Sequence, residues 1–285
     1  MRATRHGSDA LRSGSGNMNA VPAGHGWNWV LSGFALFRKS PSLWAFLVFC
    51  YIMLMQLLGM IPVLGWFAAT VLIPAFSASF MIISREFDHG NRPGVGLLFA
   101  GFRSNLPALL TQGGLYLASA LLILGLSALV DGGLLLKLML LGEKPPAAAF
   151  EDGSLAAAAV LAAILYLPVL AAFWFAPALS AWRNFSALQA MFYSLFAGLR
   201  NWRAFLVYGF TLVLLSIICS FALFLLALLA RGLLGNRSQD ALLLVVLPVM
   251  LTYVPTLFAS FYASYRDIFP QPADAPEAGA AADAQ

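Results

Sequence analysis

The fold class is decided by long uncharged runs such as residues 204–230, which read AFLVYGFTLVLLSIICSFALFLLALLA. This run contains no Asp, Glu, Lys, Arg or His, and it exceeds the roughly 20 apolar residues that a helix needs to cross the bilayer hydrocarbon. A helix also satisfies its own backbone hydrogen bonds, which is necessary because hydrocarbon offers no partners. The run therefore predicts a transmembrane helix.

Other runs of this kind cover residues 43–60, 63–83, 106–130, 155–181 and 241–265. The first two are separated only by a turn near Pro62. A single helix over both would extend roughly 60 Å, about twice the hydrocarbon thickness, so two spans joined by a tight hairpin fit better. We predict an all-α integral membrane protein with six transmembrane helices.

The composition supports a membrane protein and argues against a nucleic-acid-binding one. Hydrophobic residues make up 61% of the chain and charged residues 10%, whereas a soluble domain has about 45–50% and roughly 25%. The net charge of +4 is interpreted as the excess of Lys and Arg that membrane proteins keep on their cytoplasmic loops.

The distribution of basic residues predicts that both termini are cytoplasmic. With that orientation, the outer loops hold only Lys137, Lys144, Arg231 and Arg237. The outer loop 131–154 is net acidic, and its Asp131 is interpreted as a turn or interface residue. Three basic residues lie in the leader, and the inner segments hold the others, namely Arg38, Lys39, Arg85, Arg92, Arg103, Arg183, Arg200, Arg203 and Arg266.

Both ends of the chain have compositions typical of disorder. Residues 1–26 are rich in Gly and Ser, lack the apolar core of a signal peptide, and are predicted to be a disordered leader. The true start is either Met1 or Met18. Residues 270–285 are rich in Ala and Pro with acidic side chains, and are predicted to be a disordered tail. A single membrane domain is expected over residues 27–269.

A short motif recurs before the odd-numbered spans. Leu98-Phe-Ala-Gly-Phe-Arg103 and Leu195-Phe-Ala-Gly-Leu-Arg200 match at all but one position, and Phe34-Ala-Leu-Phe-Arg38 is a looser copy. A second signature closes each even-numbered span, as Arg85-Glu-Phe87, Arg183-Asn-Phe185 and Arg266-Asp-Ile268. These patterns predict three tandem repeats, each a short cytoplasmic interfacial helix followed by two spans.

The predicted interfacial helices have apolar stripes at helical spacing. Such helices lie flat at the boundary between headgroups and acyl chains, and arginines at their ends can reach lipid phosphates. The predicted lipid-headgroup residues are Arg38, Arg103, Arg200 and Arg203. One stripe consists of Trp27, Val30, Leu31 and Phe34, and the other of Leu188, Met191, Phe192, Leu195 and Leu199.

Nothing in the sequence indicates catalysis, a metal or a cofactor. The spans contain no ionisable side chains, and no metalloprotease, phosphate-loop or nucleophile-elbow motif occurs. Cys50 and Cys219 are interpreted as buried thiols. The polar loop 85–92 is interpreted as a solvated linker rather than an active site. The intramembrane amides of Gln56 and Gln112 are hardest to explain by packing alone, because an amide in hydrocarbon needs partners.

Four motifs together resemble a family of uncharacterised proteobacterial inner-membrane proteins. They are Gly26-Trp-Asn-Trp29, Leu36-Phe-Arg-Lys-Ser-Pro41, Leu98-Phe-Ala-Gly-Phe-Arg103 and Phe173-Trp-Phe-Ala-Pro177. The resemblance implies a fold and an inner-membrane location, with no activity to carry over. The paired spans are also distantly similar to the membrane region attached to some glycerophosphodiester phosphodiesterases, whose catalytic domain has no counterpart here.

Two functions remain open. The first is a non-enzymatic scaffold, accessory subunit or lipid-interacting module whose partners are membrane lipids or another membrane protein. The alternative is a small transporter or channel for an uncharged or amphipathic solute. Kinked spans and intramembrane glutamines would favour the alternative.

Overall fold

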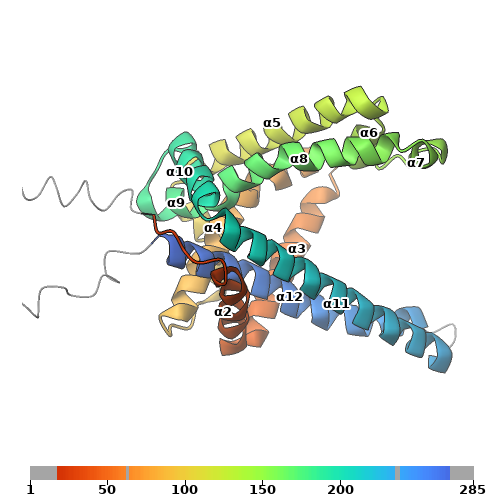
Figure 1. The fold of residues 1–285 in the computed structure, drawn as a ribbon. Helices are drawn as coiled ribbons and strands as arrows, with labels where there is room; N and C mark the ends of the chain where they lie inside the picture. Colours follow the sequence, from red (N-terminus) through yellow and green to blue (C-terminus); the bar gives the residue numbers. More distant parts are fainter. Residues whose placement is uncertain (1–17, 62–63, 235–237, 270–285) are drawn as a thin grey trace, which may run out of the picture. The chain divides into compact units, whose positions relative to one another are not determined.

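The computed structural model describes residues 18–61, 64–234 and 238–269, and all regular structure in these ranges is helical (Figure 1). The described chain forms two compact units. Unit 1 contains residues 18–49, 80–95 and 200–269, and unit 2 contains the described residues of 50–79 and 96–199. The single membrane domain expected from the sequence stays a prediction.

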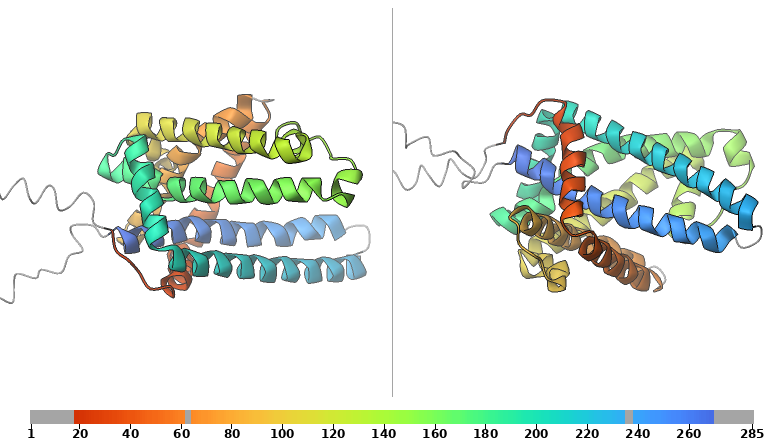
Figure 2. Two further views of the ribbon diagram at one scale, coloured as in Figure 1. Left: turned by 45° about the horizontal axis from the view of Figure 1, so that its top comes forward. Right: turned by 90° about the horizontal axis from the view of Figure 1, so that it is seen from below.

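Unit 1 is organised around α11 (Trp202–Leu234) and α12 (Ser238–Ile268), which lie side by side. The short helix α2 (His25–Lys39) crosses both of them, as the right panel of Figure 2 shows. The beginning of α3 (Pro41–Gly59) and the end of α4 (Leu64–Asp88) complete the unit.

Two glycines bring the backbone of α2 against its neighbours. A methyl group on Gly26 would overlap the carbonyl oxygen of Ala204, and one on Gly33 would lie 2.5 Å from the carbonyl oxygen of Thr256. Because any side chain there would push α2 away, the two glycines set how closely it crosses α11 and α12.

Aromatic rings fill the core of unit 1. Trp44 is fully buried and stacks on Phe87, with ring centroids 5.3 Å apart. Phe80 stacks on Phe258 at 4.1 Å and joins α4 to α12. Trp29, on α2, is buried in the same core.

Unit 2 is organised around α5 (Leu106–Asp131) and α8 (Ser154–Trp174), which lie side by side (Figure 1). A methyl group on Gly113 of α5 would overlap the carbonyl oxygen of Val71, so α5 also touches the backbone of α4. The remaining helices of this unit are η1 (Val95–Phe99), η2 (Gly101–Arg103), α6 (Leu134–Leu141), α7 (Ala148–Glu151), α9 (Ala176–Arg183) and α10 (Ala187–Arg200).

Five helical segments of the described chain are long and apolar enough to cross a membrane, and they coincide with five of the predicted spans. They are Pro41–Gly59, Leu64–Asp88, Leu106–Asp131, Ser154–Arg183 and Trp202–Leu229. The sixth predicted span, residues 241–265, falls within α12, but several of its side chains lie outside the described part of the chain.

The predicted span 155–181 is divided into α8 and α9 at Phe175. Pro177 cannot donate a backbone hydrogen bond to the preceding turn, which explains why the helix breaks there. The predicted outer loop 131–154 contains the short helices α6 and α7.

The prediction of an interfacial α-helix before the third span is wrong. The chain makes two 3₁₀ turns there instead. Glycines at 94, 96 and 101 disfavour a regular helix. A methyl group on Gly101 would also overlap the carbonyl oxygen of Ala75, so close packing demands glycine at this point. The helices expected at the other two copies are present as α2 and α10.

The disordered leader predicted over residues 1–26 extends too far toward the C-terminus. Residues 19–26 are ordered, and the backbone N–H of Asn19 donates to the carbonyl of Ile268 at 2.8 Å. The composition of this segment did not indicate its order, because the hydrogen bonds that hold it use backbone groups and partners far away in the sequence. Residues 1–17 and 270–285 lie outside the described residues.

Candidate functional site

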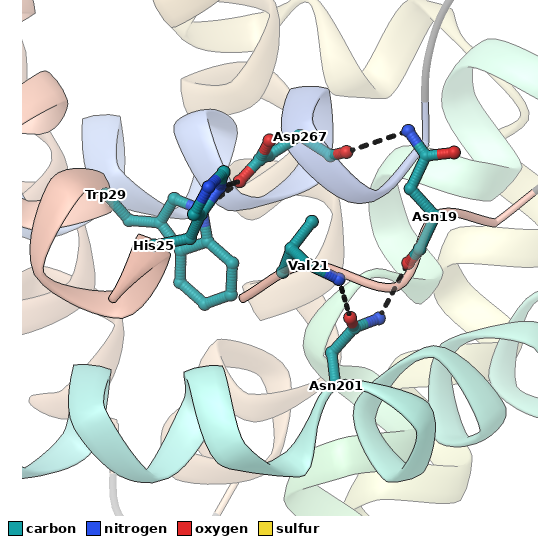
Figure 3. A network of polar contacts seen from close by, with 6 residues as sticks. All are labelled: Asn19, Val21, His25, Trp29, Asn201 and Asp267. Atoms are coloured by element: carbon teal, nitrogen blue, oxygen red, sulfur yellow. Dashed lines mark hydrogen bonds and ion pairs between the residues drawn. The ribbon is translucent and has the colours of Figure 1, made fainter. Parts of the chain in front are cut away.

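The N-terminal segment 19–24 is bonded to the end of α12, and Asp267 is the centre of this contact (Figure 3). One carboxylate oxygen of Asp267 accepts from Trp29 Nε1 at 2.8 Å and lies 2.7 Å from His25 Nδ1. An ionised carboxylate can only accept, so the Nδ1 of His25 carries the proton in this contact. Asp267 therefore fixes the first turns of α2 against α12.

Asn201 holds the same segment from the start of α11 (Figure 3). Its side-chain oxygen accepts from the backbone N–H of Val21 at 2.8 Å, and its Nδ2 donates to the carbonyl of Asn19 at 3.0 Å. The amide thus pairs with the backbone as a neighbouring strand would. Since Asn201 is buried, losing this pairing would leave polar groups without water.

A second carboxylate, Asp88, ties the end of α4 to α12. Asp88 accepts from Arg266 Nη1 at 2.5 Å and from the hydroxyl of Tyr262 at 3.0 Å. Lys39, the last residue of α2, donates to the carbonyl of Phe87 at 2.7 Å. The ends of α2, α4 and α12 and the starts of α3 and α11 therefore meet at one end of unit 1.

This end of unit 1 contains a cavity of about 320 Å³, which we call the basic cavity. Its side chains combine two cations with small polar groups and two apolar residues. The lining residues are Lys39, Ser40, Leu43, Phe87, Gly90, Asn91 and Arg92. The loop 85–92, interpreted from sequence as a solvated linker, thus forms one wall of a concave site.

The arginines predicted to contact lipid headgroups are all exposed: Arg38, Arg103, Arg200 and Arg203. The guanidinium of Arg38 lies over the ring of Phe34, 5.8 Å from its centroid. That of Arg203 lies over Trp202 at 5.5 Å. These contacts hold each cation beside an exposed aromatic ring.

The two predicted intramembrane glutamines occupy different environments. Gln56 is exposed on α3. Gln112 is fully buried in unit 2, where its Nε2 donates to Ser180 Oγ at 2.7 Å and to the carbonyl of Ala176 at 3.2 Å. Gln112 therefore joins α5 to α9, and its Oε1 is buried without a hydrogen-bond partner in the described part of the chain.

Ser194 of α10 fills the break between α8 and α9. Its hydroxyl donates to the carbonyl of Ala171 at 2.7 Å and accepts from the N–H of Phe175 at 2.9 Å. These two backbone groups would bond each other in an unbroken helix. A side chain inserted in this way accounts for the bend.

Asp131 acts as a turn residue, as predicted. Its carboxylate accepts from the backbone N–H groups of Gly133 at 2.8 Å and Leu135 at 2.6 Å. Asp131 thereby caps the start of α6. Because both of its oxygens accept hydrogen bonds, the carboxylate can be buried at the end of a span.

A curated relative matches most of the chain in sequence. The chain is 38% identical over 255 residues to a probable inner membrane protein of Burkholderia thailandensis, and the match covers 87% of this chain and 92% of the relative. The chain belongs to this family of proteobacterial inner-membrane proteins. No protein-family model matches this inner-membrane protein, and no solved structure matches it. Its family and its apolar helices together make it an integral protein of the inner membrane.

Sequence reasoning missed His25, Asp267 and Asn201 as partners in one site. The closing signature Arg266-Asp-Ile268 contained a signal, because a carboxylate beside a span end needs a donor. However, its donors are Trp29 and His25, which precede it by 238 and 242 residues. No local pattern connects positions so far apart.

Proposed function

We propose that this inner-membrane protein is a non-enzymatic, lipid-interacting module with six spans and both termini in the cytoplasm. The observation that carries the proposal is the pair of helices α2 and α10, each of which combines an exposed apolar stripe with arginine at its C-terminal end.

The stripe on α2 consists of Trp27, Leu31 and Phe34, which are all exposed, and it ends at Arg38. Val30, expected in this stripe, instead packs inside unit 1. The helix is therefore apolar on both faces, one against protein and one outward. An outward apolar stripe beside an arginine suits the boundary between acyl chains and headgroups.

The stripe on α10 has the same form. Leu188, Phe192 and Leu199 are exposed at helical spacing, and Arg200 ends the helix. An arginine near an anionic leaflet contributes about 1 kcal/mol of attraction. Several such residues would therefore give a clear preference for anionic lipid.

Replacement of Arg103 and Arg200 by Gln tests the proposal. The double variant should retain phosphatidylglycerol about 30-fold less tightly, since two contacts of about 1 kcal/mol are lost. Retention is measured by native mass spectrometry after exposure to mixed vesicles, with Arg231→Gln as the control for loss of one exposed charge. Unchanged retention in the double variant would count against the proposal. A stoichiometric protein that stays bound would instead favour an accessory subunit.

The proposed topology is supported by unit 1. The ends that meet there belong to segments assigned to the cytoplasm by their basic residues, including Arg38, Lys39, Arg92, Arg203 and Arg266. Six spans require the first and last residues to lie on the same side. Reporter fusions at each terminus test this orientation, and a periplasmic signal from either terminus would refute it.

The proposed threefold repeat places α2 before α3 and α4, the η turns before α5 and α8, and α10 before α11 and α12. The Arg85-Glu and Arg266-Asp signatures support the repeat because both lie at the polar end of unit 1. The middle copy differs from the other two, because it forms 3₁₀ turns where they form an α-helix.

A second candidate function is transport of an uncharged or amphipathic solute. It is favoured by Gln112, whose buried Oε1 stands beside the break between α8 and α9. Gln112→Leu should then abolish flux while expression persists, and Gln56→Leu provides the comparison at an exposed site. Flux that survives both changes would remove the motivation for transport. Thermal stabilisation by a solute separates this candidate from a lipid-interacting module.

A further inference from the structure

We propose that the basic cavity of unit 1 binds a phosphate group carried by an anionic phospholipid headgroup. This inference rests on the proposed lipid interaction and gives it a defined site, one that shares no residue with the arginines tested above. Three features support such a site: hydrogen-bond donors line the cavity, Lys39 has a fixed position, and one wall is apolar.

The polar side chains that line the cavity are chiefly hydrogen-bond donors. Lys39 and Arg92 carry positive charge, and Ser40 contributes a hydroxyl. The Lys39 ammonium has three N–H groups and directs two toward the carbonyls of Phe87 and Asp88, at 2.7 and 3.4 Å. The third N–H remains for a ligand, and a phosphate oxygen is the acceptor that two cations and a hydroxyl favour.

The two acidic side chains of the loop 85–92 have hydrogen-bond partners within the protein. Glu86 accepts from Asn91 Nδ2 at 2.8 Å, and Asp88 accepts from Arg266 and Tyr262. Neither carboxylate is among the lining residues. Asp88 also attracts the Lys39 ammonium electrostatically, but its oxygens accept hydrogen bonds from Arg266 and Tyr262, so the N–H groups of the cavity stay directed to other acceptors.

Lys39 is already held in place. Its bond to the carbonyl of Phe87 joins the end of α2 to the end of α4 in the absence of any ligand. A lysine usually loses much rotamer freedom on binding, and here part of that cost is met by folding. The site thus keeps a cation at a defined position.

The apolar wall favours a lipid over a free ion. Leu43 lies in the first turn of α3, a span, so this wall continues into the membrane-facing helix. Phe87 is buried at the end of α4, another span. Basic pockets between membrane helices at their cytoplasmic ends are typical binding places for phospholipid headgroups.

Native mass spectrometry of the full-length protein tests the cavity, after exposure to vesicles of phosphatidylglycerol and phosphatidylcholine. Arg92→Gln and Lys39→Gln should each weaken phosphatidylglycerol retention roughly tenfold, because each removes a charge-assisted hydrogen bond. Lys137→Gln, an exposed lysine of α6, is the matched control and should bind as the wild type does. Since Lys39 also caps α4, Arg92→Gln is the decisive variant, and Arg92→Lys should restore most of the binding.

A second arm identifies the source of the phosphate. Inorganic phosphate added to the protein in detergent should leave the wild-type melting temperature unchanged. A melting temperature that rises with phosphate in the wild type but not in Arg92→Gln would show a site for free phosphate and overturn the lipid assignment. Wild-type protein that prefers phosphatidylglycerol, with Arg92→Gln and Lys39→Gln equally selective, would overturn the cavity and leave the proposed function standing. No preference in the wild type would overturn both.

Discussion

Replacing Gly33 by Ala should destabilise unit 1, although Ala is the better helix former. The added methyl group would lie 2.5 Å from the carbonyl oxygen of Thr256 and 2.7 Å from the backbone N of Ser260. Both atoms belong to the backbone of α12 and cannot rotate away. The helix α2 must therefore move outward as a body.

The size of the effect follows from that displacement. Restoring an ordinary contact of 3.4 Å requires a shift of about 1 Å, and such a gap forfeits a quarter to a half of each dispersion contact. Trp29, Leu36 and Phe37 are buried on this face and would all lose contacts. A loss of about 3 kcal/mol, offset by about 1 kcal/mol of helix propensity, leaves a net destabilisation of about 2 kcal/mol.

Thermal unfolding in detergent, followed by tryptophan fluorescence, measures the change. A net loss of about 2 kcal/mol should lower the melting temperature by roughly 4–8 °C. Gly26→Ala should behave similarly, because its methyl group would overlap Ala204. Gly209→Ala in α11 is the matched control, since nothing lies within 4 Å of the added carbon. If Gly33→Ala melts at or above the temperature of Gly209→Ala, α2 does not cross α12 backbone to backbone.

Three further variants test local contacts. Asn201→Ala should release the N-terminal segment, because the Val21 N–H and the Asn19 carbonyl lose their partner, and limited proteolysis should cut there faster than in the wild type. Ser194→Ala should lower the free energy of chemical unfolding by about 1–3 kcal/mol. Ser119→Ala is the control, because it removes only a hydrogen bond within its own helix. A similar loss in Ser119→Ala would argue against a special role for Ser194. Asp131→Ala should remove the cap of α6 and cost about 1 kcal/mol, seen as faster amide exchange at Leu135, and exchange that stays as slow as in the wild type would contradict this capping role.

The membrane helices could be predicted from sequence because each is a continuous local run of one chemistry. Five of them are present as helices long and apolar enough to cross a membrane, and the turn predicted near Pro62 lies outside the described residues. Asp131 was also assigned correctly, because its role is fulfilled by N–H groups two and four residues away.

The candidate site was less accessible for the opposite reason. The basic cavity joins Lys39 to residues 87–92, and the Asp267 contacts join the two ends of the described chain. Gln112 was singled out correctly as an amide that needs partners, but its partners on α9 could not be named from spacing. Gln56 carries the same chemistry and is exposed, so residue type alone did not separate the two.

The hydroxyl of Ser194 has a consequence for the order in which the protein is made. Ser194 is synthesised 19 residues after Phe175, whose N–H it occupies. While the chain is still emerging, the carbonyl of Ala171 and the N–H of Phe175 have no partner in hydrocarbon except each other. We expect the bend at Pro177 to become fixed only when α10 arrives and Ser194 takes up both groups, which makes the final geometry of the break a late event in biogenesis.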